Sequence, residues 1–396
     1  MLKRNRLLQS AATLVFIASL PFTVSAQGKE PVKIGLLTSK SGTFAAQGEE
    51  IIRAIEFAID EVNAKGGVDG RKVEAQIGDD EGTPEVGRRV AEKMAREGFN
   101  LLIGPVPSSI SLTIAQNLDR WDAAYFAVAS KSDKLTGDTC RSRSFHTTHS
   151  DAMDIAMIKE WSKSFKEKSF AIVAADYLWG HDSGEAFKKS AEAQGKTVPL
   201  SLYIPLGTKD FSPYIAQLKA ANVDAIWVAE VGRDAIAFVK QAQEFGLIPA
   251  KRLLGHALIL DFIIESTGSS LKDVAGTISY MPDIDTPRNK AFVSAWKAKF
   301  KRFPNSSEGQ AYNGVQVLFE GVKKAGSIKP ADVSKALRGA QFDSIYGKVT
   351  MRGQDNQLVM PNYVGRVKNV DGGLRAVTEV RFDPSLTPAP SPLCKM

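Results

Sequence analysis

Residues 101–121 read LLIGPVPSSISLTIAQNLDRW, and the fold can be worked out from this stretch. Three apolar residues, 101–103, lead into Gly104-Pro105, and an amphipathic stretch begins at Ser108-Ser109. The pattern predicts a short strand, a loop and then a helix over 108–120. Two interpretations of the serine pair stay open. The hydroxyls cap the helix, or they join the free backbone N–H groups of a helix start in binding an anion.

The same order of strand and helix continues in both directions along the chain. A helix is expected over 49–67, where isoleucines recur at helical spacing and Gly66-Gly67 ends the pattern. The alternation stops and then restarts near residue 169, which indicates two α/β lobes, each a doubly wound parallel sheet. The remaining strands are expected at 32–39, 72–80, 124–130, 169–176, 198–206, 224–230 and 252–258.

The end of the chain has a different pattern. Residues from about 345 to 382 read as β structure, with a hairpin at NVDGG (369–373). The segment PSLTPAPSP (384–392) is rich in proline and is expected to be extended.

Composition and the first residues indicate an exported protein with two domains. The chain has 396 residues, of which 43% are apolar and 24% charged. Lys3, Arg4 and Arg6 precede an apolar run over about 11–22 and the small residues Val24-Ser25-Ala26. This pattern predicts a signal peptide, residues 1–26, cleaved after Ala26, and a location in the periplasm; an uncleaved membrane anchor is the alternative.

The charge pattern gives no sign of nucleic-acid binding. Removal of the three leader cations lowers the net charge from +7 to +4. Acidic and basic residues are interspersed along the rest of the chain, and no basic run carries interleaved aromatic residues. The two cysteines, Cys140 and Cys394, both lie in the exported part, where they form a disulfide or remain as two free thiols.

A search for catalytic motifs finds none. A phosphate loop, a dinucleotide fingerprint and a G-x-S-x-G nucleophile elbow are all missing from the sequence. His146 and His149 are three residues apart, but no cysteine or carboxylate pattern completes a metal site. The acids at 79–81 fit a turn before a helix. We therefore expect no enzyme activity, no cofactor and no metal, and a binding protein in preference to a catalyst.

Polar and small residues follow several of the predicted strands. In open α/β sheets, ligands bind beyond the carboxyl ends of the strands. Each of the residues after a strand has a simpler interpretation as a solvated or capping residue, yet together they predict a cleft between the two lobes. The residues after the strands are Ser108-Ser109, Ala129-Ser130-Lys131, Tyr177 to Trp179, Glu230-Val231 and His256-Ala257.

Several blocks of sequence resemble one known family. The blocks NAKGGVDGRKVE (63–74), LLIGPVPSSISLTIA (101–115), DYLWGHDSGEAF (176–187) and DFSPYIAQLK (210–219) are similar to the periplasmic solute-binding proteins of branched-chain amino-acid-type ABC importers. The resemblance covers nearly all of the mature chain. It implies two lobes joined by three crossings, near 147–150, 278–282 and 354–358, which close on a ligand between them.

The resemblance also implies how the chain divides. The N-terminal lobe would comprise 27–148 and 280–355, and the C-terminal lobe 149–279 and 356–385. LTGDTC (135–140) and the final CKM (394–396) match a subgroup whose tail cysteine bonds back to the first lobe. On that basis the tail, 386–396, would be tied back by a Cys140–Cys394 disulfide.

The family's ligand-binding positions can be carried over to this sequence. The carboxylate of the ligand would be held on the first lobe by the serine loop and by the loop after the next strand. Gln47, Trp179 and Val231 match positions that are often aromatic. The first-lobe residues that would hold the carboxylate are Ser108, Ser109, Ala129, Ser130 and Lys131.

Two positions depart from the pattern of amino-acid binders. Lys131 stands where a threonine is usual, and Ala257 stands where an acid usually pairs with the ligand's ammonium. The neighbouring His256 is neutral or cationic and is a poor substitute for that acid. A buried ammonium without a partner costs several kcal/mol. We therefore expect a small carboxylate without an α-amino group, unless Glu230 supplies the acid or Lys131 points out to solvent.

The resulting functional prediction is capture of a small organic ligand by lobe closure and its delivery to an ABC permease. The chain would act as a monomer. The alternatives are a ligand-sensing protein on the same fold, a conventional branched-chain amino-acid binder, and, less compatible with the missing nucleophile, an exported hydrolase.

Overall fold

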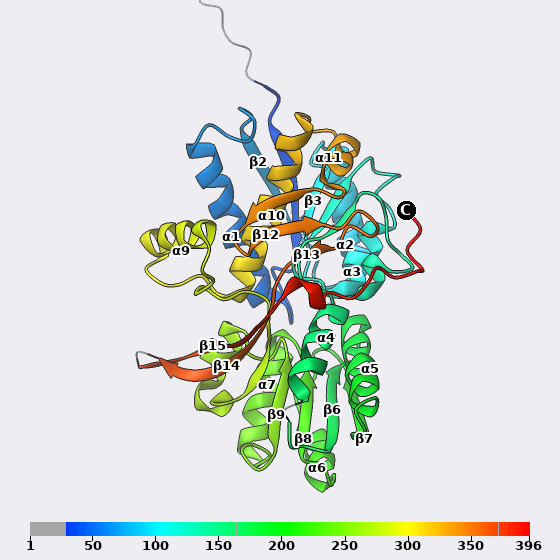
Figure 1. Ribbon diagram of the computed structural model, residues 1–396, viewed down its shortest axis with the longest axis vertical. Coiled ribbons are helices and arrows are strands. Elements are labelled where there is room, and N and C mark those ends of the chain that lie inside the picture. Colours follow the sequence, from blue (N-terminus) through cyan, green and yellow to red (C-terminus); the bar gives the residue numbers. More distant parts are fainter. Residues whose placement is uncertain (1–28, 164, 371) are drawn as a thin grey trace, which may run out of the picture.

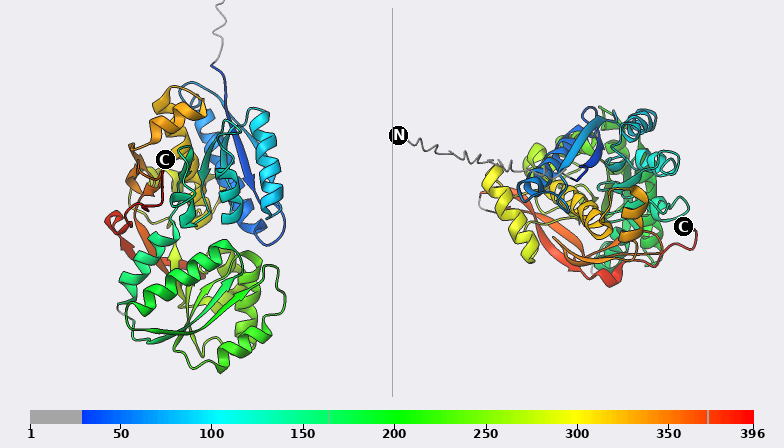
Figure 2. Two further views of the ribbon diagram at one scale, coloured as in Figure 1. Left: turned by 90° about the vertical axis from the view of Figure 1, so that its right-hand side faces the viewer. Right: turned by 90° about the horizontal axis from the view of Figure 1, so that it is seen from above.

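The computed structural model describes residues 29–163, 165–370 and 372–396. The predicted signal peptide, 1–26, therefore lies outside the described residues. Two lobes are stacked along the long axis of the molecule, each built on its own sheet (Figures 1 and 2). None of the described helices is both long enough and apolar enough to span a membrane.

The first lobe is built on a parallel five-stranded sheet of order β2-β1-β3-β4-β5. Its strands alternate with helices, as the sequence predicted. β3 is the LLIG segment, and all four of its residues are buried, because a parallel sheet is covered on both faces. The elements are β1 (Val32–Thr38), α1 (Ala45–Ala64), β2 (Val73–Asp79), α2 (Pro84–Arg96), β3 (Leu101–Gly104), α3 (Ser108–Ala115), β4 (Ala124–Ala127), η1 (Asp133–Thr136) and β5 (Ser144–His146).

The second lobe is built on a seven-stranded sheet of order β15-β14-β10-β9-β8-β6-β7. Its middle is parallel, and the last two strands join one edge as an antiparallel hairpin, the one expected around 369–373. The elements are α4 (Asp151–Ser162), β6 (Ser169–Ala175), α5 (Leu178–Glu192), β7 (Thr197–Ile204), α6 (Ser212–Ala220), β8 (Ala225–Ala229), α7 (Gly232–Glu244), β9 (Arg252–His256), α8 (Asp261–Thr267), η2 (Gly268–Leu271), β10 (Ala275–Ile278), β14 (Asn362–Val370), β15 (Gly373–Phe382) and η3 (Pro384–Leu386).

Between β10 and β14 the chain returns to the first lobe. There α10 packs along α1, and a small sheet of order β11-β12-β13 lies beside them (Figure 1). The third change of sheet falls between Val359 and Asn362, slightly later than the crossing at 354–358 that the resemblance implies. The elements are α9 (Pro287–Phe300), α10 (Ser306–Ala325), α11 (Pro330–Leu337), β11 (Gln341–Ser344), β12 (Gly347–Met351) and β13 (Leu358–Val359).

Some boundaries differ from those expected. The helix expected over 108–120 ends at Ala115, and the strand expected over 124–130 ends at Ala127. Residues 128–132 leave the sheet because they form the loop that faces the second lobe. The proline-rich segment includes a short 3₁₀ turn, η3.

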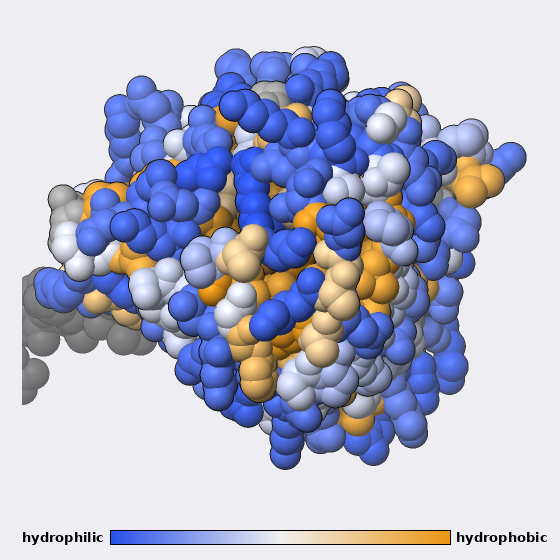
Figure 3. All heavy atoms as spheres, turned by 90° about the horizontal axis from the view of Figure 1, so that it is seen from below, coloured by the Kyte–Doolittle hydropathy of each residue, from blue (hydrophilic) through white to orange (hydrophobic). Residues whose placement is uncertain are grey.

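The tail of the chain is attached to the first lobe. Cys394 and Cys140 are joined, with a distance of 5.5 Å between their Cα atoms. Figure 2 shows the C-terminus beside the first lobe. The lower face of the second lobe is mostly hydrophilic around a central group of apolar atoms (Figure 3).

Candidate functional site

A cavity lies between the lobes at the carboxyl ends of the parallel strands. The space between its lining atoms is about 480 Å³, part of which is open to solvent. Its wall is formed by Gln47, Val106, Ser108, Ala129, Lys131, Tyr177, Trp179, Val231, Ala257, Leu260, Thr277, Ile278, Ser279 and Gln310.

The cavity brings together many but not all of the residues singled out in the sequence. Seven of them form part of its wall: Gln47, Ser108, Ala129, Lys131, Trp179, Val231 and Ala257. Four do not: Ser109, Ser130, Glu230 and His256. That the seven bind a ligand stays a prediction.

Ser108 is the first residue of α3, not its cap. The residue at the cap position is Pro107, whose backbone is extended and which makes no side-chain cap. The capping interpretation of Ser108 is therefore wrong. The first N–H groups of a helix have no partner within it, so this end of α3 presents donors next to the buried Ser108 hydroxyl.

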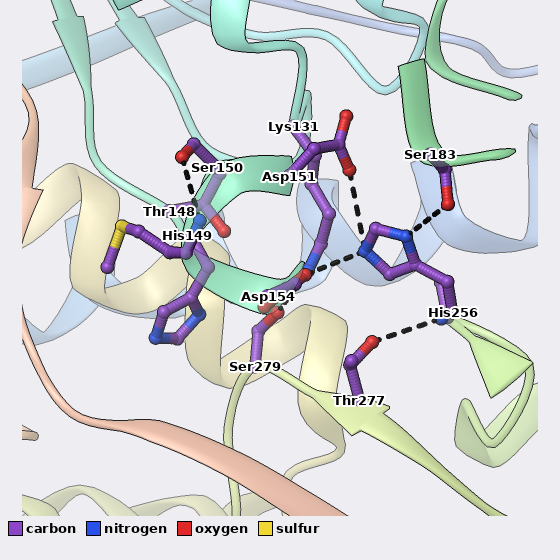
Figure 4. Close-up of polar contacts among 12 residues, drawn as sticks. Lys131, Thr148, His149, Ser150, Asp151, Asp154, Ser183, His256, Thr277 and Ser279 are labelled. Carbon is purple, nitrogen blue, oxygen red and sulfur yellow. Dashed lines mark hydrogen bonds and ion pairs between the residues drawn. The ribbon is translucent and has the colours of Figure 1, made fainter. Parts of the chain in front are cut away.

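Lys131 points inward. Its side chain is only 9% exposed, and its ammonium forms an ion pair with Asp154 and donates a hydrogen bond to Ser279 Oγ at 3.0 Å (Figure 4). The alternative of a solvated lysine outside the cleft is wrong. Because Asp154 lies on α4 and Ser279 follows β10, Lys131 connects the loop after β4 to segments of the second sheet.

Behind the ion pair lies a buried chain of hydrogen bonds. His256 Nε2 lies 2.7 Å from Asp154 Oδ2, and His256 Nδ1 lies 2.6 Å from Ser183 Oγ (Figure 4). Burial raises the pKa of Asp154, but the nearby Lys131 and His256 more than offset this and hold it well below its usual range. Burial lowers the pKa of His256. The imidazole is thus neutral, with Nε2–H donating to Asp154 and Nδ1 accepting from Ser183.

The order Ser183–His256–Asp154 resembles the side-chain set of a serine hydrolase, which no sequence motif had indicated. The three residues come from α5, β9 and α4. The side chain of Ser183 is fully buried and forms no part of the cavity wall, so a substrate in the cavity does not reach its hydroxyl. Ser183 and His256 hold in place the Asp154 carboxylate that pairs with Lys131, and the three residues do not provide an accessible nucleophile.

Trp179 is fixed on the second-lobe side of the cavity. Its indole N–H donates to Asp151 Oδ1 at 2.9 Å, and its ring lies 5.0 Å from the His256 ring. Burial raises the pKa of Asp151 well above its usual value, with a further contribution from Asp133. The neighbouring Tyr177 contacts Phe44 of the first lobe edge to face at 6.0 Å. Aromatic side chains therefore close one end of the cavity.

The cavity wall has a single charged member within the described part of the chain, Lys131, and no Asp or Glu. Ala257 presents a methyl group. Glu230 is 1% exposed and lies off the wall, its Oε1 has no hydrogen-bond partner among the described residues, and burial raises its pKa well above the usual value. The arrangement therefore suits an anion better than an ammonium.

Tyr177, which the sequence indicated as a residue after a strand end, also lies in the wall. The sequence did not indicate Thr277 in β10, Ser279 just after it or Gln310 in α10, nor Asp151 and Asp154 on α4. A polar residue at a helix start carries no signal of its partner across a cleft. Among the described residues, no group of three or more His, Cys, Asp or Glu is arranged to hold a metal ion.

Comparison with known proteins places the chain in a family. A family model described as periplasmic binding protein matches residues 31–373. A Leu/Ile/Val-binding protein, BraC3 from Rhizobium johnstonii, is 28% identical over 344 residues, covering 85% of this chain and 91% of the relative.

Solved structures agree on the fold. A solute-binding protein of an ABC transporter from Rhodopseudomonas palustris BisB5, in complex with 3,4-dihydroxybenzoic acid, is 25% identical with a TM-score of 0.82, covering 90% of this chain and 98% of that one. A leucine-binding protein from Thermotoga maritima has a TM-score of 0.81 at 20% identity, covering 89% and 99%. The predicted type I periplasmic binding protein fold is confirmed, and this chain belongs to the periplasmic binding protein family.

Proposed function

We propose that this chain is the solute-binding component of an ABC importer and that it captures a small carboxylate without an ammonium group. The observation that supports this most directly is the charge of the cavity wall. Lys131 is its one charged member among the described residues, and no acid stands opposite to receive an ammonium. The described residues supply two partners to the Lys131 ammonium, which leaves its third N–H for a ligand.

The anion would be held from the first lobe. The Ser108 hydroxyl and the start of α3 face the cavity together with Lys131, and free N–H groups at a helix start favour an anion. Capture then follows from lobe closure, which brings Tyr177 and Trp179 over the ligand. Closure is favoured only to the extent that the ligand binds the closed form better than the open form.

The rest of the ligand would be apolar and flat or branched. Val106, Val231, Leu260 and Ile278 supply aliphatic surface to the wall, and Tyr177 and Trp179 supply aromatic surface. An aromatic carboxylate fits this lining, and the Rhodopseudomonas palustris relative was solved with one.

The same proposal includes the cellular context. The chain would be exported to the periplasm with cleavage after Ala26, act as a monomer without enzymatic activity, and deliver its ligand to a membrane permease. The lobes would divide as 27–148 with 280–355 and 149–279 with 356–385, except that the last boundary moves to between Val359 and Asn362, where the chain changes sheet. The Cys140–Cys394 bond would form in the oxidising compartment.

A second candidate is a conventional branched-chain amino-acid binder. The name of the Rhizobium johnstonii relative supports it, and so does the buried Glu230, whose unpartnered Oε1 lies one residue before Val231 of the cavity wall. In that case Glu230 would ionise on binding and pair with the ammonium.

Thermal unfolding separates the two candidates. The mature chain is heated with leucine, isoleucine, valine and phenylalanine, and separately with 4-methyl-2-oxopentanoate, benzoate, 4-hydroxybenzoate and 3,4-dihydroxybenzoate. A ligand at 100 times its Kd adds about 2.7 kcal/mol to the unfolding free energy. Stabilisation by carboxylates alone supports the proposal. Stabilisation by amino acids alone contradicts it and favours Glu230 as the ammonium partner.

A further inference from the structure

The Lys131 ammonium is already neutralised before a ligand arrives. Asp154 is ionised and forms an ion pair with it, and both side chains are nearly inaccessible to water. A ligand carboxylate on the third N–H of Lys131 would therefore place two carboxylates around one ammonium. An excess negative charge in a buried site is costly, so binding of an anion favours the uptake of a proton nearby.

Three buried histidines lie close enough to Lys131 to be considered. His146 Nε2 lies 2.6 Å from the Ser130 carbonyl, and His149 Nε2 lies 2.8 Å from the Pro361 carbonyl. In both rings Nδ1 is buried and has no hydrogen-bond partner among the described residues. Protonation of His149 at that position would create a buried N–H without an acceptor, which is unfavourable. Beside His146 lies the neutral amide of Gln357, and burial and the charge of Lys131 lower the pKa of that histidine.

His256 differs from both. Its Nε2 faces the Asp154 carboxylate and its Nδ1 faces the Ser183 hydroxyl, and each of these groups can accept a hydrogen bond. A proton on Nδ1 can be donated to the Ser183 oxygen once that hydroxyl turns its hydrogen away from the ring. The resulting imidazolium would share the Asp154 charge with Lys131, so that the three side chains and the ligand carboxylate together carry no net charge.

Other groups around this network are less suited to take the proton. Asp151 Oδ1 lies 3.4 Å from His256 Nε2 and accepts the Trp179 indole N–H, and burial raises the pKa of Asp151 well above its usual value. Asp133, whose pKa burial raises to about 6, accepts a hydrogen bond from the Ala152 N–H. The Asp182 carboxylate accepts a hydrogen bond from the Ser132 hydroxyl and forms an ion pair with Lys134 at 3.8 Å. The titratable and charged groups facing the network are Lys131, Asp133, Lys134, His146, His149, Asp151, Asp154, Tyr177, Asp182 and His256.

We infer that His256 is a positioning residue that takes up one proton from water when an anionic ligand binds to Lys131. It does not touch the ligand and acts through Asp154. The inference rests on the proposed function, because it requires a carboxylate ligand. Since the complex holds more protons than the free protein, carboxylate affinity rises as pH falls and declines as pH rises through the pKa of His256 in the complex.

The test is calorimetric titration of the wild-type chain with benzoate and 4-hydroxybenzoate at pH 7, in phosphate, imidazole and Tris. Because these buffers differ in heat of ionisation, the apparent binding heat reports the number of protons exchanged. We expect uptake of about one proton per ligand and an affinity that falls by up to about tenfold per pH unit above neutrality. Benzamide, which is neutral, should bind without proton uptake.

His256→Gln should abolish the uptake and flatten the pH profile, since Gln can donate to Asp154 but cannot be protonated. His181→Gln is the matched control, because His181 is a half-exposed histidine on α5, bonded to Asp176. Carboxylate binding without uptake, or full uptake in His256→Gln, would overturn the inference. If that variant does not fold, nitrogen NMR of wild-type His256 decides: the ring must become protonated in the complex. Failure of every carboxylate to bind contradicts the proposed function instead.

Discussion

The backbone carbonyl oxygen of Thr43, in the first lobe, lies 2.0 Å from the position that a Cβ on Gly232 would occupy in the second lobe. The same carbonyl accepts a hydrogen bond from the Arg233 N–H at 3.2 Å. The start of α7 thus docks directly on the loop before α1, and only a residue without a side chain allows this approach. This contact between the lobes therefore depends on one glycine.

Gly232→Ala is therefore expected to prevent full closure. To relieve the clash, the lobes must move apart by at least about 1 Å, and ligand affinity should fall by more than about tenfold, because binding energy depends on the closed form. Small-angle scattering with ligand and calorimetric titration would measure both effects. Gly246→Ala is the control, since Gly246 also has a positive φ, +68°, but no atom within 4 Å of the added methyl. Equal losses in the two variants would contradict the prediction.

Removal of the Lys131 charge should cost stability as well as binding. Lys131→Met leaves the Asp154 carboxylate buried without its cation, which typically costs about 3–5 kcal/mol. The double variant Lys131→Met with Asp154→Asn removes both charges and should recover much of that stability, but not carboxylate binding. Urea unfolding measures the change in stability, and calorimetric titration measures carboxylate binding. Carboxylate binding by the double variant at wild-type affinity would show that Lys131 is not the anchor.

Stability should depend on pH through Glu50, a buried residue of α1 whose pKa burial raises from 4.5 to about 8. Because the folded state holds this proton more tightly, its contribution is complete below pH 4.5 and is lost as pH rises to about 8. Glu50→Gln keeps an acceptor for Asn305 and should be more stable than wild type at pH 8, by on the order of a few kcal/mol. Thermal unfolding at pH 5 and pH 8 measures this.

The exposed neighbour Glu49 provides the control for that experiment. Glu49→Gln should leave the difference in stability between pH 5 and pH 8 unchanged. An identical pH dependence in wild type and Glu50→Gln would mean that Glu50 is ionised in the folded protein.

The disulfide should stabilise the fold without affecting the ligand site. Cys140 and Cys394 are 254 residues apart, and neither forms part of the cavity wall. Replacement of both by Ser should lower the unfolding free energy by about 2–4 kcal/mol and leave ligand affinity within about twofold. Thiol labelling of the exported, denatured chain should find no free thiol before reduction and two after it. Two labelled thiols without reductant would support the free-thiol alternative.

Much of the fold could be predicted because local patterns determine it. Apolar runs such as LLIG predicted the buried strands, and isoleucines at helical spacing predicted α1. The sequence NVDGG predicted the hairpin of the last two strands. The predicted end of α3 was wrong, because the apolar spacing of the sequence continues to residue 120 whereas the helix ends at Ala115. Most of the stability of a helix comes from tertiary packing, which the sequence pattern does not report.

The candidate site was predictable only in part. Residues such as Ser108, Lys131 and Trp179 follow strands, and the edge of a parallel sheet collects such residues in one place. Ser279 was not predicted because the strand that it follows, β10, was not among the strands expected from the sequence, and Gln310 lies within the helix α10. Neither position carries a local signal that it will face a cavity.

The sequence by itself determined that there are two α/β lobes. The family resemblance then assigned Lys131 and Ala257 to ligand-binding positions, but it did not decide whether Lys131 points into the cleft. Periodicity, turn residues and residue types are local properties, so they can be read along the chain. Only the tertiary structure decided what the lysine does. Lys131 meets Asp154, and Asp154 meets His256, 102 residues further along, because three separate segments converge at the lobe junction. The charge state of such a buried group depends on neighbours that only folding brings within a few ångströms.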